Sequence, residues 1–317
     1  MKPKKILIIR FSSIGDIVLT TPVIRCVKEQ LKAEVHFVSK SVFAPVLNAN
    51  PYIDKIHPFT NEITELFDIL KKEEFDLVID LHNNLRSLRL RKKLGVPSTV
   101  FSKINVRKFM AVNLKLTNML PDKHIVERYL ESVKHLGVKD DGKGLDYFLT
   151  KEDEVEIPKE NYSVLVVGGS YFTKKIPMKK LEEICSIVNH PLLLVGGKED
   201  VVEAKVLAEK FGHVKNCCGQ YTFGQSAFII GASSQVITSD TGMMHIASAF
   251  NKKIVSLWGN TIPEFGMSPY LPNKKNVILE VNKLKCRPCS KLGFKKCPKG
   301  HFKCMMDIEL KKSNLEL

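Results

Sequence analysis

Residues 5–31 read KILIIRFSSIGDIVLTTPVIRCVKEQL and contain, in one short stretch, the alternation that decides the fold. The opening run KILIIR (5–10) is short and β-branched, which predicts a strand. Residues 16–31 have apolar side chains at helical spacing, so that one face of a helix would carry Val18, Val23, Val27 and Leu31. The loop between them holds two serines and a glycine, and the helix starts with Asp16. Because an ordinary connection needs only one capping residue, Asp16 is a candidate to face a ligand.

The same alternation continues along the chain. Further strands are predicted at EVHFVS (34–39), FDLVIDL (75–81) and STVFS (98–102), with a helix over RSLRLRKKL (86–94). The hydrophilic stretch LTKEDEVEIPKEN (149–161) interrupts the pattern, so we expect two domains, 1–155 and 156–317. Strands alternating with helices predict an α/β fold with parallel sheets.

Four strands of the second half run into Gly, Ser, Asp or Asn, at YSVLVVGGS (162–170), PLLLVGGKED (191–200), SQVITSDTG (234–242) and KKIVSLWGN (252–260). In an open α/β sheet, ligands bind beyond the carboxyl ends of the strands. Four polar strand ends in the second half, together with one in the first, therefore suggest a ligand held between two such domains.

The composition is that of a globular protein, with 317 residues, 44% hydrophobic and 26% charged. No apolar run is long enough for a membrane helix, and the N-terminus lacks a signal-peptide pattern, so a cytoplasmic location is expected. The net charge of +15 is concentrated locally: residues 81–121 carry nine Lys/Arg and 283–304 carry eight, with no acid in either stretch. Such stretches attract nucleic acid, acidic lipid head groups or phosphorylated sugars, although a solvated positive face is the plainer alternative.

The segment SDTGMMHIASAF (239–250) carries the strongest chemical signal. Asp240 follows a strand, Thr241 and Gly242 form a turn, and His245 lies in the first turn of the helix that follows. Backbone N–H groups at a helix N-terminus favour an anion. Ordinary capping by Asp240 or Thr241 would explain one of these residues, but not the four together.

In this segment and in three others, the chain resembles glycosyltransferase family 9, the ADP-heptose:lipopolysaccharide heptosyltransferases. The matching motifs are SSIGD (12–16), DTGMMHIA (240–247), WGNTIPEFGMSPY (258–270) and the tail CRPCSKLGFKKCPKGHFKC (286–304). The resemblance implies a GT-B fold, in which two Rossmann-like domains face each other across a cleft. It further implies that the N-terminal domain binds the acceptor and the C-terminal domain the nucleotide sugar, and that the reaction inverts the anomeric centre without a metal.

The resemblance also implies roles for single residues. Asp16 matches the general base, a group that contributes ~10²–10⁴-fold to such reactions, and at a helix N-terminus it should stay ionised. Lys174 matches a lysine near the phosphates, with Lys175 as the alternative, and Ile176 stands where the family usually has Trp. The remaining donor-side matches are Ser170, Thr241, Gly242 and His245 near the phosphates, Asp240 at the sugar hydroxyls, Asp200 (or Glu199) at the ribose, and Tyr221 and Thr222 near the adenine. The acceptor-side matches are Ser13, His82, Asn83 and Arg86, and the basic run to Lys108 suits an anionic acceptor.

The eight cysteines fall into two groups. Cys26, Cys185, Cys217 and Cys218 are scattered and read as small core residues. Cys286, Cys289, Cys297 and Cys304 cluster in the tail with His301 among them, and the opening C-x₂-C has metal-site spacing. A structural zinc ion, packed thiols and disulfides all remain open for this tail, which is not expected to take part in catalysis. The last helix is expected to pack back on the N-terminal domain.

The sequence thus predicts an inverting, metal-independent heptosyltransferase of lipopolysaccharide core biosynthesis, with no cofactor needed for catalysis. It would use ADP-heptose and an anionic glycolipid acceptor at the inner face of the inner membrane, as a peripheral protein. One alternative keeps the fold and mechanism with another nucleotide sugar or glycan acceptor. An alternative of a different class is a basic nucleic-acid-binding protein with a zinc tail. It is disfavoured because residues 81–121 contain only two aromatic side chains, Phe101 and Phe109, for stacking on bases.

Overall fold

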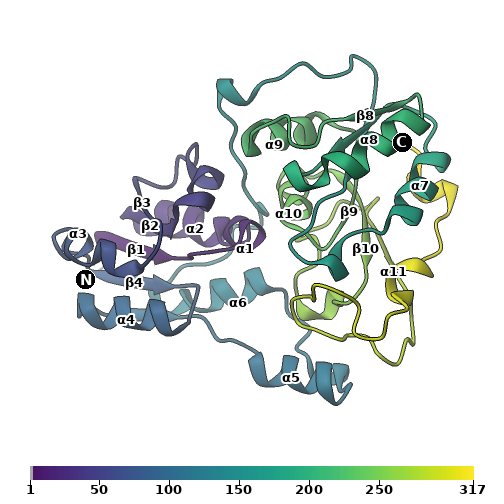
Figure 1. Ribbon diagram of the computed structural model, residues 1–317. Helices are drawn as coiled ribbons and strands as arrows, with labels where there is room; N and C mark the ends of the chain where they lie inside the picture. The colour runs from purple at the N-terminus through teal and green to yellow at the C-terminus, as the bar shows by residue number, and fades with distance from the viewer. Residues whose placement is uncertain (1–2) are drawn as a thin grey trace. The chain divides into compact units, whose positions relative to one another are not determined.

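The computed structural model describes residues 3–317, and these form two compact units, each with one parallel β-sheet (Figure 1). The first unit comprises the residues up to 103 and 123–148, and the second comprises 104–122 and 149–317. All strand pairs in both sheets are parallel, which confirms the predicted α/β class.

The sheet of the first unit has the strand order β3-β2-β1-β4-β5. Its central strand, β1, is covered on both faces, because Ile6, Leu7, Ile8 and Ile9 are all fully buried. The strands are β1 (Lys5–Ile9), β2 (Glu34–Lys40), β3 (Lys55–Phe59), β4 (Leu77–Asp80) and β5 (Ser98–Val100). The helices are α1 (Ile14–Val18), α2 (Thr21–Leu31), α3 (Phe67–Lys71), α4 (Leu85–Leu94) and α6 (Ile125–Glu131), with 3₁₀ turns η1 (Ser41–Leu47), η2 (Ile63–Leu66) and η4 (Lys134–Leu136).

The single helix predicted over 16–31 is two helices, α1 and α2. Pro22 lies in the first turn of α2 and has no N–H to continue the hydrogen bonding of α1. The hydroxyls of Thr20 and Thr21 instead donate to the carbonyls of Ile17 and Val18, at 2.6 and 2.8 Å. The break leaves Asp16 on a short helix of its own.

The sheet of the second unit has the order β11-β10-β9-β6-β7-β8. Leu165, Ile237 and Leu257 on one face of this sheet pack with α7, α8, α11 and α12, and Figure 1 shows α9 and α10 on the other side of β9 and β10. The strands are β6 (Ser163–Val166), β7 (Leu192–Val195), β8 (Val214–Asn216), β9 (Gln235–Ser239), β10 (Lys253–Trp258) and β11 (Val277–Glu280). The helices are α5 (Asn105–Asn113), α7 (Met178–Ile187), α8 (Val201–Lys210), α9 (Phe223–Ala232), α10 (Gly242–Ala249), α11 (Lys303–Met306) and α12 (Lys312–Leu315). The 3₁₀ turns are η3 (Thr117–Met119), η5 (Lys151–Asp153), η6 (Phe172–Lys174), η7 (Lys198–Asp200) and η8 (Pro263–Phe265).

Two segments pack in a different unit from the one predicted from the sequence. Residues 104–122, which fall within the predicted domain 1–155, pack with the second unit, where Ala111 of α5 is buried against Ile262 and Phe265. The last helix, α12, was expected to pack on the N-terminal domain. It packs instead in the second unit, where Leu315 is part of the main apolar core and its carbonyl accepts a hydrogen bond from Gln235. The apolar Leu315 decides this placement, because it fills that core next to α7.

Candidate functional site

In the first unit, Asp16 sits in the first turn of α1, immediately beyond the carboxyl end of β1. One of its carboxylate oxygens accepts hydrogen bonds from Ser13, at 2.8 Å from the hydroxyl and 3.3 Å from the backbone nitrogen. The other oxygen lies 2.6 Å from the guanidinium of Arg10. The Asp16 side chain keeps 20% of its surface exposed, so it is held in place and still reachable.

Arg10, which the sequence analysis did not single out, supports this loop. Its side chain is 10% exposed and donates to the carbonyls of Ser12 and Leu81 and to the hydroxyl of Tyr129. Burial alone would lower the pKa of Arg10, but the neighbouring Asp16 carboxylate raises it, and the net change is upward. The Asp16 carboxylate is therefore fixed by a permanent cation whose Nε and Nη1 donors are also bonded.

The loop after β4 lies beside the loop after β1, because β1 and β4 are paired with Ile9 opposite Asp80. Asp80 is fully buried and shapes this loop: it accepts from the backbone nitrogens of His82 and Asn83 and pairs with Arg91 at 2.9 Å. Asn83 has a positive φ of 49°, a conformation that asparagine tolerates. Its side-chain amide donates to the carbonyl of Phe101 at 3.0 Å, so part of its hydrogen-bonding capacity is structural.

His82 and Arg86, two predicted acceptor contacts, gather around Phe11 in the same unit. The His82 ring lies 4.8 Å from the Phe11 ring, and the Arg86 guanidinium 5.7 Å from it. Burial, and then the positive charges of Arg10, Lys103 and Arg86, lower the pKa of His82 to about 3. The imidazole is therefore neutral at physiological pH, and its buried Nδ1 has no hydrogen-bond partner within residues 3–317.

In the second unit, Lys174 and Asp240 form an ion pair of 2.6 Å. Lys174 ends η6, which follows β6, and Asp240 follows β9, the strand next to β6. The same Asp240 oxygen accepts from the Thr261 hydroxyl at 2.9 Å. The structure thus brings two predicted donor-site residues together at the carboxyl edge of the sheet, and adds Thr261 to them.

Lys175 and Asp200 form a second pair of 2.6 Å, but the Asp200 side chain is completely buried. Its second oxygen accepts from the backbone nitrogen of Gly197 at 2.9 Å. A Cβ atom on Gly168 or Gly196 would come within 2.6 or 2.8 Å of that oxygen, so both glycines are needed for this packing. Asp200 therefore stabilises the conformation of the loop after β7. Glu199, the alternative from the sequence, is exposed.

The other predicted donor residues differ in how accessible they are. Thr222 caps α9, accepting from the backbone nitrogen of Gln225, and Tyr221 beside it is partly exposed. Thr241 precedes α10, but its hydroxyl pairs with that of Thr238 and does not cap the helix. Gly242 is partly exposed, Ser170 is exposed and His245 is 2% exposed. The first-turn amides of α10 thus lie next to the Asp240–Lys174 pair without a cap from Thr241.

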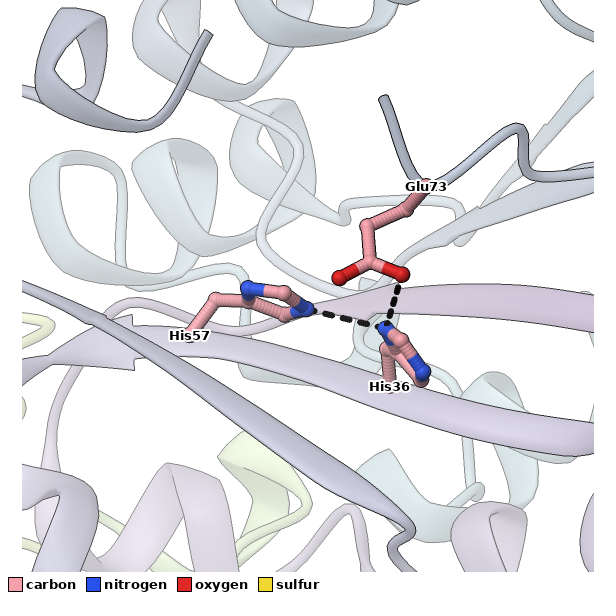
Figure 2. A group of neighbouring side chains, drawn as sticks. All are labelled: His36, His57 and Glu73. Atoms are coloured by element: carbon pink, nitrogen blue, oxygen red, sulfur yellow. Dashed lines mark hydrogen bonds and ion pairs between the residues drawn. The ribbon is translucent and has the colours of Figure 1, made fainter. Parts of the chain in front are cut away.

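Metal-ligating side chains also meet away from these strand ends. His36 of β2, His57 of β3 and Glu73, which precedes β4, form one such group in the first unit (Figure 2). The two imidazoles are joined by a hydrogen bond of 2.9 Å, and Glu73 Oε2 lies 4.0 Å from His36 Nδ1. Each Glu73 oxygen, however, already contacts a lysine ammonium at 2.5 Å, one from Lys5 and the other from Lys55. These hydrogen bonds and ion pairs lower the pKa of Glu73 to about 2, and the groups satisfy one another as a structural network.

The tail cysteines lie in the second unit, with Cys304 buried in its core and the other three partly exposed. Burial, and then the neighbouring thiols of Cys289, Cys297 and Cys286, raise the pKa of Cys304 to about 12. Within residues 3–317, two groups of ligating atoms lie within 4.8 Å of one another, the one around His36 and a second made of Cys26, Asp140 and Asp141, and the tail cysteines belong to neither. The four thiols are the right type of ligand for zinc, but an ion would have to draw them closer together.

The chain is similar to known proteins in sequence and in structure. The model of glycosyltransferase family 9 (heptosyltransferase) matches residues 63–295. The lipopolysaccharide heptosyltransferase 1 of Campylobacter coli is 23% identical over 302 residues, which cover 81% of this chain and 84% of that protein. A family 9 glycosyltransferase from Veillonella parvula has a similar structure, with a TM-score of 0.74 and 21% identity over 88% of this chain and 86% of that one.

The Escherichia coli heptosyltransferase WaaC with ADP-2-deoxy-2-fluoro heptose is also similar, with a TM-score of 0.66 and 19% identity over 86% of this chain and 92% of that one. At these identities, similarity to the two solved structures is evidence for the fold alone. They confirm the predicted GT-B fold.

Proposed function

This chain belongs to glycosyltransferase family 9 (heptosyltransferase), and on that premise we propose that it transfers a heptose from ADP-heptose to an anionic acceptor of the lipopolysaccharide inner core. Membership makes it a glycosyltransferase enzyme. The proposal adds the donor, the acceptor, inversion at the anomeric carbon and independence of a metal. Its support is the name of the Campylobacter coli relative and the ADP-heptose analogue held by the Escherichia coli one.

The observation that carries the proposal is the Lys174–Asp240 ion pair at the carboxyl edge of the second sheet. A departing nucleoside diphosphate gains negative charge, and a lysine fixed beside it stabilises that charge without a divalent cation. The uncapped first turn of α10 adds N–H donors and the positive end of a helix dipole. Asp240 and Thr261 are suited to hydrogen bonding with sugar hydroxyls, because the Asp240 carboxylate accepts hydrogen bonds and the Thr261 hydroxyl both accepts and donates them.

Asp16 supplies the second half of the chemistry. In a single displacement, the acceptor hydroxyl oxygen forms a bond to the anomeric carbon on the face opposite the ADP. The hydroxyl proton passes to the Asp16 carboxylate, the bond from the anomeric carbon to the phosphate oxygen breaks, and its electron pair leaves with ADP. His82 is neutral and lies in the same unit, so it can donate to or accept from an acceptor hydroxyl.

For the ribose we propose Glu199 in place of Asp200. The Asp200 carboxylate is enclosed and fully bonded, whereas Glu199 is exposed in the same loop beyond β7. Glu199→Gln should weaken ADP binding while leaving the melting temperature unchanged. Unchanged ADP affinity would exclude the assignment.

The test of the donor is calorimetric titration of the purified chain with ADP, UDP and GDP. A preference for ADP that Lys174→Ala removes would support an ADP-sugar donor. A preference for UDP or GDP would keep the reaction class and discard ADP-heptose. Transfer that survives EDTA, with a product of inverted anomeric configuration by NMR, would support the mechanism. Loss of transfer in EDTA that returns with Mg²⁺ would refute metal independence.

We also propose that Cys286, Cys289, Cys297 and Cys304 hold a structural zinc ion, without a part in catalysis. Elemental analysis of chain purified in reducing buffer should find about one zinc per molecule, and its removal should lower the melting temperature. A metal-free chain with the same melting temperature before and after a chelator would exclude zinc from the tail.

A further inference from the structure

Exposed apolar side chains concentrate in a short stretch of the second unit. Of the 16 large hydrophobic residues that are exposed among the described residues, five fall within residues 106–119, namely Val106 (73%), Phe109 (63%), Leu114 (60%), Leu116 and Met119. The stretch covers most of α5 and the turn η3. Such a concentration of apolar surface is unusual for a monomeric protein facing only water.

The arrangement on α5 is that of an amphipathic helix. Val106, Phe109 and Met110 stand at positions i, i+3 and i+4, so they share one face, and Val106 and Phe109 are the most exposed of the three. Ala111, which points away from that face, is fully buried against Ile262 and Phe265. The helix is thus anchored to the second unit by one side and presents apolar side chains on the other.

The charge of this stretch is uniformly positive. Residues 104–121 contain Arg107, Lys108 and Lys115 and no acid. Two of these cations also fix the stretch in place: Lys108 Nζ lies 5.1 Å from the centroid of the Phe265 ring, and Lys115 Nζ donates to the carbonyl of Pro288 at 2.7 Å. Arg107 is exposed beside the apolar face.

We propose that residues 104–121 dock the protein on a bilayer surface that contains anionic lipids. Exposed apolar side chains flanked by cations are what an interfacial helix needs, because the apolar groups enter the head-group boundary while the cations pair with lipid phosphates. The inference rests on the proposed function, since a glycolipid acceptor has to be reached at a membrane. Docking by this segment would hold the enzyme at that surface. Among residues 3–317, no helix able to span a membrane is found.

Vesicle sedimentation of the full chain tests the proposal directly. The wild type should bind phosphatidylethanolamine/phosphatidylglycerol vesicles and bind pure phosphatidylcholine vesicles far more weakly. The double variant Val106→Glu/Phe109→Glu should bind the anionic vesicles at least tenfold more weakly, and Arg107→Gln about fivefold more weakly. Val202→Glu/Val206→Glu is the matched control, because it alters two exposed valines of α8, outside the proposed surface, and it should bind as the wild type does.

A fluorescence readout locates the contact. The single native tryptophan, Trp258, is buried, so a tryptophan placed at Phe109 reports its own surroundings. Phe109→Trp should shift its emission to the blue with anionic vesicles and be quenched by brominated lipid, whereas Val202→Trp should show neither change. Wild-type affinity in the double variant, or quenching at position 202 alone, would overturn the proposal.

Activity measurements separate this inference from the proposed function. With a deacylated, water-soluble acceptor the double variant should transfer heptose as fast as the wild type, and with acceptor in vesicles it should be slower. Vesicle binding without any heptosyl transfer would refute the proposed function and support residues 104–121 as the membrane-docking surface. Equal rates of heptosyl transfer to acceptor in vesicles by the wild type and the double variant would refute membrane docking by residues 104–121. A wild type that ignores vesicles and forms a dimer, with the double variant monomeric at an equal melting temperature, would assign this face to a second copy and refute membrane docking.

Discussion

Lys174 Nζ lies 2.6 Å from the Asp240 carboxylate, so the cation proposed to meet the leaving diphosphate is held in place by an acid. The pair keeps the ammonium at the carboxyl edge of the sheet, where the nucleotide of an α/β protein binds. A phosphate that arrives there competes with Asp240 for the same charge. The Thr261 hydroxyl donates to the same Asp240 carboxylate, so Asp240 would keep one hydrogen bond if the lysine turned to the phosphate.

Replacing Lys174 should therefore affect both nucleotide affinity and rate. We expect Lys174→Met to weaken ADP binding and to lower kcat by about 10²-fold, since a fixed donor or cation at a leaving group has that order of effect. Calorimetry and a transfer assay measure the two effects. The control is Lys179→Met, which removes an exposed lysine of α7. Wild-type kcat with weakened ADP binding would restrict Lys174 to ground-state binding.

The neighbouring Lys175 should behave differently, because its partner Asp200 is fully buried. Lys175→Met leaves that carboxylate without its cation, which should cost roughly 2–3 kcal/mol of unfolding free energy, less than a fully buried pair since Lys175 is partly exposed. Urea unfolding of Lys174→Met and Lys175→Met side by side gives the comparison. Equal stability of the two variants would contradict the structural role of the Lys175–Asp200 pair.

Asp16→Asn should slow transfer strongly while leaving ADP affinity near the wild-type value. The amide keeps the shape of the side chain but cannot take the acceptor proton, so kcat should fall by ~10²–10⁴-fold. Asp68→Asn, an exposed acid on α3, is the matched control. Full turnover of Asp16→Asn would show that another group is the base.

Arg10→Gln should lower kcat without changing ADP affinity, because the 10% exposed Arg10 side chain holds Asp16, which belongs to a different unit from Lys174 and Asp240. The loss of its bonds to the Leu81 carbonyl and the Tyr129 hydroxyl should also lower the melting temperature. The telling measurement is the pH profile of kcat, in which the acidic limb should move in Arg10→Gln. An unchanged limb with a lower melting temperature would leave Arg10 a purely structural role.

The sequence predicted the repeating strand–helix pattern and the loops that carry Asp16, Lys174 and Asp240, because these features are local. What it missed depends on contacts between distant residues. Arg10 reaches Tyr129, 119 positions away, and nothing in the spacing of either residue indicates that contact. The family motif favoured Asp200 over Glu199, and the motif gives no sign that Asp200 is enclosed by two distant glycines, the observation on which the proposal of Glu199 rests. One available signal was overlooked: Pro22 in the middle of residues 16–31 predicts the break between α1 and α2.

Acid should destabilise the fold through two buried histidines, His57 and His82. Burial first, and then neighbouring charges, lower the pKa of His57 to about 4 and that of His82 to about 3. In the unfolded chain a histidine has a pKa of about 6.5. As the pH falls below that value the unfolded state binds protons that the folded state does not, so the free energy of unfolding decreases. The stabilisation is complete above pH 7 and is lost progressively towards pH 4 and 3.

Urea unfolding at pH 7.5 and pH 5.0 measures this loss. Each histidine should contribute about 1–2 kcal/mol to the decrease between these pH values. His57→Gln should therefore show a smaller decrease than the wild type, and His57→Gln/His82→Gln a smaller one still, even if both variants are less stable at pH 7.5. The same decrease in all three proteins would mean that neither imidazole is held neutral by the fold. In that case the neutral His82 beside Asp16 would also have to be abandoned as a hydrogen-bonding partner for the acceptor.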